Sequence, residues 1–137
     1  MPTQIFVNLP VKNLNASVQF FTKLGYKFNK QFTDDTATCM IVSDCIYVML
    51  LTEQKFRTFT PKAIADAKQS TEVLVCLSCE NRAQVEDMVR KAVAAGGSTY
   101  APPQDHGFMF QHGFQDLDGH IWELIYMDPA AVQREVA

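Results

Sequence analysis

The sequence predicts an α+β fold in which two βαβββ modules form a curved mixed sheet around a concave cavity. The order strand, helix, strand, strand, strand occurs twice along the chain, which indicates an internal repeat. The chain has 137 residues, 47% of them apolar, which is enough for one domain with a core. We expect a single domain over residues 1–137, with modules at 1–51 and 72–127, a connector at 52–71 and a C-terminal tail at 128–137.

The first module begins with an alternating strand, "TQIFVNLPV", in which Ile5, Val7 and Leu9 face the core. A helix is predicted in "NLNASVQFFTKLGY", with an asparagine at 13 or 15 as its cap and Gly25 at its end. The three strands that follow are expected in the segments "YKFNKQF", "TATCMIVS" and "CIYVMLL".

The connector contains a short helix-like stretch, "PKAIADAKQ", and the second module follows it with the same order of elements. Its helix is predicted in "NRAQVEDMVRKAVAAGG", with Asn81 as cap and Gly96 at the end. Its strands are expected in the segments "TEVLVCLSC", "STYAPP", "GFMFQHGF" and "HIWELIYM".

Charge and composition exclude several classes of function. The net charge of −3 and the pI of about 5.5 leave no cationic surface for nucleic acid. The longest apolar run, Ile46 to Leu51, is too short to span a membrane, and the N-terminus has no export signal, so we expect a cytoplasmic protein. In that compartment its four cysteines are expected to be free thiols.

Glu123 is a single carboxylate inside the aromatic and aliphatic stretch "HIWELIYM". It could be a structural acid bonded to a neighbour such as Asn8. It could also face an apolar pocket, where desolvation would raise its pKa and let it contact a ligand or act as a base.

Two further groups of residues bear on that pocket. His112 has the same strand parity as Phe108 and Phe110 and could reach Glu123 across the hairpin, which would give an acid–base or metal-binding pair. Phe6 lies opposite the helix-facing set and is expected in the concavity. An aromatic floor with one acid suits a planar or cationic organic molecule.

These segments resemble the vicinal oxygen chelate superfamily, which includes glyoxalase I, extradiol dioxygenases and the bleomycin and fosfomycin resistance proteins. The resemblance rests on "VNLPVKNLNASVQFFTKLGYKF", "VRKAVAAGG" and "FQDLDGHIWELIYMD", and it covers essentially the whole chain. The segment "PQDHGFMFQHGFQDLDGHIWELIYMDP" is similar to a bacterial subgroup described as lactoylglutathione lyase-like.

The resemblance implies four metal-ligand positions, one on the first and one on the last strand of each module. They fall on Phe6 or Asn8, on Met49 or Leu50, on Leu74 with Cys76 as the next residue on that face, and on Glu123. Only Glu123 is a usual ligand. Because a hard divalent ion needs several oxygen or nitrogen donors, we expect no cofactor, with a divalent metal as the alternative.

The sequence therefore predicts a metal-independent protein that binds a small organic molecule in the cavity between the modules. The expected contacts are Phe6, Asn8, Leu50, Leu74, Cys76, Phe108, Phe110, His112 and Glu123. One alternative is a lyase, isomerase or dioxygenase-type enzyme with a noncanonical metal or acid–base site at Glu123 and His112, in which Glu123 is catalytic. Another is a self-association or partner-binding module. The resemblance also implies a homodimer.

Overall fold

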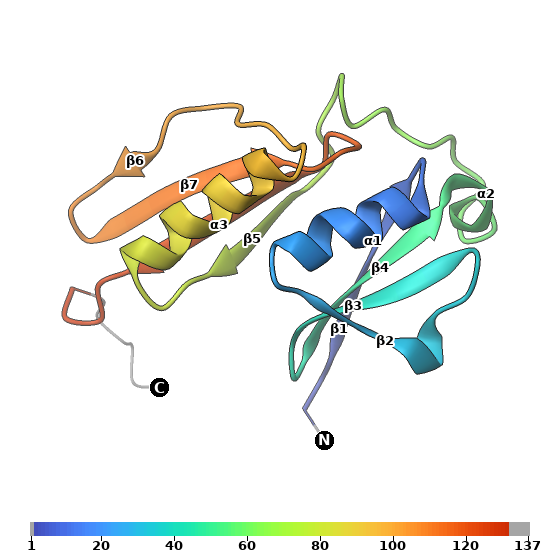
Figure 1. The fold of residues 1–137 in the computed structure, drawn as a ribbon, viewed down its shortest axis with the longest axis horizontal. Helices are drawn as coiled ribbons and strands as arrows, with labels where there is room; N and C mark the ends of the chain where they lie inside the picture. Colours follow the sequence, from blue (N-terminus) through green and yellow to red (C-terminus); the bar gives the residue numbers. More distant parts are fainter. Residues whose placement is uncertain (1, 132–137) are drawn as a thin grey trace. The chain divides into compact units, whose positions relative to one another are not determined.

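The computed structural model describes residues 2–131, which fold as two compact units divided between Asp66 and Ala67 (Figure 1). The first unit contains β1 (Ile5–Val11), α1 (Leu14–Lys23), β2 (Lys27–Asn29), the 3₁₀ turn η1 (Lys30–Phe32), β3 (Ala37–Ser43), β4 (Ile46–Thr52) and α2 (Glu53–Phe56). The second unit contains β5 (Leu74–Ser78), α3 (Arg82–Ala94), β6 (Gln104–Asp105), β7 (Met109–Gln115) and β8 (Ile121–Met127). The two predicted βαβββ modules are confirmed.

Each unit has its own four-stranded mixed sheet, and the two sheets share one topology. The strand orders are β1-β4-β3-β2 and β5-β8-β7-β6. In each sheet the first strand pairs in parallel with the last, and the remaining pairs are antiparallel. The last strand of each unit is therefore central, with a neighbour on both sides.

The two long helices, α1 and α3, begin and end where the sequence predicts. Asn13 accepts a hydrogen bond from the Ala16 amide at 3.0 Å, and Asn81 accepts one from the Gln84 amide at 2.7 Å, so each side chain pairs an otherwise free amide of the first turn. Gly25 and Gly96 follow the helices with φ angles of +103° and +111°, which favour glycine. Of the two possible caps of the first helix, the structure selects Asn13.

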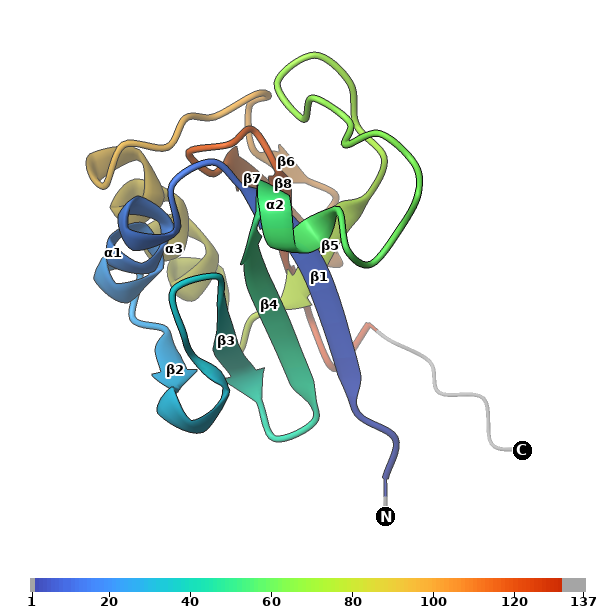
Figure 2. The same cartoon turned by 90° about the vertical axis from the view of Figure 1, so that its right-hand side faces the viewer.

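One face of each sheet is covered by the helix of the same unit (Figures 1 and 2). In the first unit, Phe20 and Phe21 of α1 are buried together with Leu9, Val48 and Leu50 of the sheet. In the second unit the buried residues of α3 meet a sheet face that contains Phe110, Phe114, Trp122 and Leu124. We call this side the helix face of each sheet and the other side its open face.

Three predicted elements are wrong in position or kind. The "PKAIADAKQ" stretch, residues 61–69, forms bends and a turn, because a helix of so few residues is marginal on its own. The strand expected at 98–103 is reduced to a bridge from Ser98 to Gln115, and β6 begins only after Pro102 and Pro103, which cannot donate to a ladder. The strand expected at "YKFNKQF" ends at Asn29, whose side chain starts η1.

Within residues 2–131, no helix has both the length and the apolar character that crossing a membrane requires. The predicted C-terminal tail lies mostly beyond the described residues, because residue 131 is the last of them.

Candidate functional site

Asp116 holds the turn that leads into β8. Its Oδ1 accepts hydrogen bonds from the backbone amides of Asp118 and His120, both at 3.0 Å, and its Oδ2 accepts one from Trp122 Nε1 at 3.0 Å. The residue is only 6% exposed. Burial raises the pKa of this carboxyl, and the nearby His120 and the three hydrogen bonds act against that rise. Asp116 is thus a structural acid that fixes the β7–β8 hairpin.

Glu123 lies on the open face of the second sheet. On β8 it alternates with Trp122 and Leu124, which are buried on the helix face. Cys76 of β5 and Gly113 of β7 are its direct neighbours across the sheet. Gln111, on the same face of β7, donates a hydrogen bond from Nε2 to Glu123 Oε2 at 3.0 Å. The carboxylate is therefore part-buried, oriented by a neutral amide, and separate from the core.

Tyr100 packs over the backbone beside Glu123, and Gly113 makes this possible. A Cβ atom at Gly113 would overlap the Tyr100 hydroxyl and lie 2.6 Å from the Trp122 carbonyl oxygen. Burial raises the pKa of Tyr100, and its neighbours Glu123 and Cys76 raise it further. The phenol therefore stays protonated at neutral pH and can donate or accept a hydrogen bond.

These side chains border a cavity of about 120 Å³ that is formed within the second unit alone. Sites for whole drug-sized ligands are typically about 300–1,000 Å³, so this cavity admits a group of a few heavy atoms. Its lining residues are Tyr100, Ala101, Pro102, Gln104, Gln111, His112, Gly113 and Glu123.

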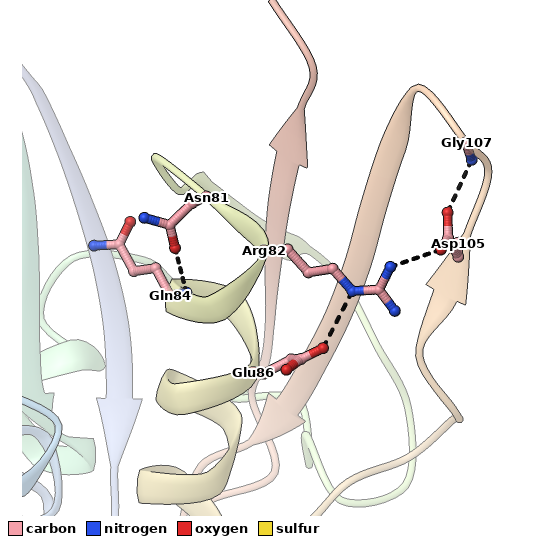
Figure 3. A network of polar contacts seen from close by, with 6 residues as sticks. All are labelled: Asn81, Arg82, Gln84, Glu86, Asp105 and Gly107. Carbon is pink, nitrogen blue, oxygen red and sulfur yellow. Dashed lines mark hydrogen bonds and ion pairs between the residues drawn. The ribbon is translucent and has the colours of Figure 1, made fainter.

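One wall of the cavity is anchored to α3 by a polar network (Figure 3). Arg82 donates to Asp105 Oδ2 at 2.8 Å and to Glu86 Oε1 at 3.2 Å. The Gly107 amide donates to Asp105 Oδ1 at 2.9 Å, and this bond, followed by that from Arg82, lowers the pKa of Asp105. Asp105 and Gln104 are the two residues of β6, so the network that holds Asp105 also positions Gln104 at the cavity.

Five predicted contacts lie on open faces. Leu74, Cys76 and Glu123 share the open face of the second sheet. Burial raises the pKa of Cys76, and the charge of Glu123 raises it further, so the thiol stays protonated. In the first unit, Phe6 and Asn8 lie on the open face, where the half-exposed ring of Phe6 stacks on Tyr47 with a centroid distance of 4.9 Å.

Three predicted contacts, Leu50, Phe110 and His112, lie on helix faces, so their expected orientation is wrong. Leu50 is fully buried and pairs with Leu9 of β1. Phe110 is 5% exposed, with the Arg82 guanidinium 4.1 Å from its ring centre. The predicted alternation of these strands is correct, but the large apolar side chains of each alternating set pack against the helix instead of facing the cavity.

His112 does not form the expected pair with Glu123. It borders the cavity, but on β7 it lies opposite Leu124, and Glu123 lies opposite Gly113, so the two side chains project from different faces. Burial lowers the pKa of His112. The acid–base pair of the enzyme hypothesis is therefore not formed. Phe108 precedes β7 and is half exposed beside His106.

The residues around Glu123 do not fit a divalent metal ion. Nowhere between residues 2 and 131 do three His, Cys, Asp or Glu side chains gather as a metal site would require. The neighbours of Glu123 are an amide, a protonated thiol and a protonated phenol. A hard cation needs several oxygen or nitrogen donors that can replace its water.

Sequence reasoning missed Tyr100, Gln111 and Gly113, which complete the surroundings of Glu123. Gly113 carried a usable signal, since a glycine inside a strand often marks the close approach of another group. Gln111 could have been predicted beside Glu123 if Phe110 and His112 had been placed on the helix face of β7. Tyr100 lies in the loop after α3, and no pattern in the sequence places it.

Comparison with known proteins agrees with this fold. The family model for the Glyoxalase/Bleomycin resistance protein/Dioxygenase superfamily matches residues 4–124. A search of curated proteins found no match.

Solved structures resemble the chain over most of its length. The hypothetical protein SA1046 from S. aureus is 25% identical, with a TM-score of 0.78 over 92% of this chain and 94% of that one. A family enzyme from Burkholderia phytofirmans is 11% identical, with a TM-score of 0.78 over 93% and 100%. The fosfomycin resistance protein FosX from Mesorhizobium loti is 11% identical, with a TM-score of 0.68 over 95% and 96%. The predicted resemblance is confirmed: this chain belongs to the glyoxalase/bleomycin resistance protein/dioxygenase superfamily.

Proposed function

We propose that this protein binds a small organic molecule without a metal ion, at the open face of its second sheet. The observation that carries the proposal is the Glu123 carboxylate, which borders a cavity and is held by Gln111. Glu123 and the core-facing Trp122 are neighbours on β8, so the acid stands on a rigid strand rather than on a loop. A polar group fixed in this way can orient a ligand.

The proposed contacts combine one charge with neutral and apolar groups. Glu123, Gln111 and Tyr100 supply hydrogen-bonding atoms, and Leu74 and Cys76 extend the same face toward β5. The predicted contacts Phe6 and Asn8 belong to the first unit and do not line this cavity. Metal independence is supported by the chemistry of the donors near Glu123, which suits an organic group better than a hard cation.

A ligand screen on the chelator-treated protein tests this proposal. Saturation-transfer NMR with a library of small organic fragments should give binders that are weakened by Glu123→Gln. The matched control is Glu80→Gln, which removes the same charge from an exposed position of the same unit. Binders that respond equally to both variants, or a library without binders, would contradict the proposal.

We also propose a homodimer in a reducing compartment such as the cytoplasm. The dimer is supported by the half-exposed Phe6 ring on the open face of the first sheet, since large exposed apolar groups favour association. The compartment is supported by four cysteines that are all free. Light scattering should give twice the mass of one chain, and a single-chain mass would contradict the dimer.

A further inference from the structure

We propose that the cavity beside Glu123 takes the cationic nitrogen group of an organic molecule, an ammonium or an amidinium carried on an apolar body. This inference rests on the proposed function and names the chemical class of the ligand.

The charge of the cavity favours a cationic ligand. Glu123 is the one carboxylate among the residues that line the cavity, and they include no Lys or Arg. His112 also borders it, but burial favours its neutral form. In the part of the chain that the structure describes, Glu123 belongs to none of the ion pairs on α2, on α3 and at Asp105. A cationic ligand would supply the missing counter-charge.

The hydrogen bond between Gln111 and Glu123 leaves acceptor atoms free for a ligand that donates. Gln111 uses its Nε2 donor on Glu123 Oε2. This leaves Glu123 Oε1 and Gln111 Oε1 as acceptors on neighbouring strands, with the Tyr100 oxygen beside them. A group with several N–H donors matches this set, whereas a carboxylate or phosphate would be repelled by the Glu123 charge.

The size of the cavity and the residues of its wall also fit such a ligand. A cavity of about 120 Å³ holds a head group and leaves the rest of the ligand outside. The Tyr100 ring and Pro102 form part of the wall, and an aromatic ring attracts a cation that is near its face. Leu74 and Ile121, on the same open face as Glu123, offer apolar surface to the body of the ligand.

Three probes with one ring and different charge test the inference: benzamidinium, benzamide and benzoate. Each is titrated into ¹⁵N-labelled full-length protein, and the amide shifts are followed. We expect benzamidinium to perturb Gln111, Gly113 and Glu123 and to bind about tenfold more tightly than benzamide, because a charge-assisted hydrogen bond replaces a neutral one. Benzoate should leave these amides unchanged.

Two variants assign the preference to Glu123. Glu123→Gln keeps the shape of the side chain and an acceptor for Gln111, and it should bring the two affinities together. Glu80→Gln should keep the tenfold difference, and thermal melting checks that both variants are folded. If benzamide or benzoate binds at these residues as tightly as benzamidinium, the inference is overturned and the binding site stands. If no probe perturbs these residues, both the inference and the proposed site are overturned.

Discussion

The open faces of the two sheets have the same topology but different chemistry. In the first unit, the row through the middle of the sheet is Asn8, Met49 and Cys39; in the second it is Cys76, Glu123 and Gly113. The first row has a flexible apolar side chain on its central strand, and the second has a charge. The scaffold is common to both units, and the residues on the last strand decide which one carries a polar site.

The neighbouring β7 position sharpens this difference. Cys39 of the first row and Gly113 of the second are equivalent positions. The buried side chain of Cys39 fills its position, whereas Gly113 leaves room for the Tyr100 hydroxyl. The second unit also has the Asp116 turn, which fixes β8 beside β7. Among residues 2–131, the second unit alone combines a charged residue on its last strand, a glycine opposite that residue and the hydrogen-bonded Asp116 turn.

The largest expected effect is the loss of the Asp116 turn. Asp116→Ala would leave the Trp122 indole N–H and two backbone amides without their acceptor. We expect the free energy of unfolding to fall by about 4 kcal/mol, because several paired donors lose a buried charged partner. Urea denaturation measures this, with Asp116→Asn as the milder control. A loss below about 1 kcal/mol would show that the turn does not depend on this carboxylate.

A pair of substitutions on β4 tests which face of the first sheet is covered. Leu50→Ala should cost about 3 kcal/mol, because it opens a cavity under α1, and Met49→Ala should cost about 1 kcal/mol. Leu50 is fully buried, and Met49 is partly exposed on the other face. Denaturant unfolding of both variants gives the comparison, and equal costs would contradict the facing described above.

Gly113→Ala tests the close approach of Tyr100. The added methyl group would push the hydroxyl away from Glu123, and we expect a cost of about 2 kcal/mol from overpacking. In a Tyr100→Ala background, part of that cost should disappear, with a coupling of about 1 kcal/mol in a double-mutant cycle. Additive costs would mean that the two residues do not touch.

The smallest expected effect is a dependence on pH that comes from the second unit, which contains all three histidines. Burial lowers the folded-state pKa of His112 below 6.5, so the unfolded chain binds its proton first. The stability that neutral His112 contributes is complete above pH 6.5 and is lost as the pH falls toward the folded-state pKa. His112→Gln should flatten this part of the curve, while Asp116 titrates in both proteins. Identical slopes would contradict burial of the imidazole.

Local signals in the sequence were enough for the helices and for the order of the elements. Asn13 and Asn81 are caps, Gly25 and Gly96 end the helices, and alternation places most strands, since these features act within a few residues. The connector and the strand before β7 were harder. Their structure depends on prolines and on tertiary contacts more than on periodicity.

The site was only partly predictable from the sequence. It depends on which sheet face each side chain occupies and on a loop that comes close to β7. Alternation gives the two faces of a single strand, but it does not relate the faces of β4 and β7 to those of their neighbours, so Leu50, Phe110 and His112 are predicted on the wrong face. The sequence left Glu123 open between a structural acid and an acid that faces a pocket, and the structure places it on the open face, bonded to Gln111. The loop that brings Tyr100 over Gly113 has no sequence signal of its own.

The most direct test of the metal-independent site is the response of the melting temperature to metal ions. Chelator-treated wild-type protein and Glu123→Gln are melted with and without Ni²⁺, Zn²⁺, Mn²⁺ and Fe²⁺. A ligand that binds only the folded state raises the melting temperature by mass action. We expect no ion to stabilise the wild type more than the variant. A rise that depends on Glu123 would contradict the metal-independent site and make Glu123 a metal ligand.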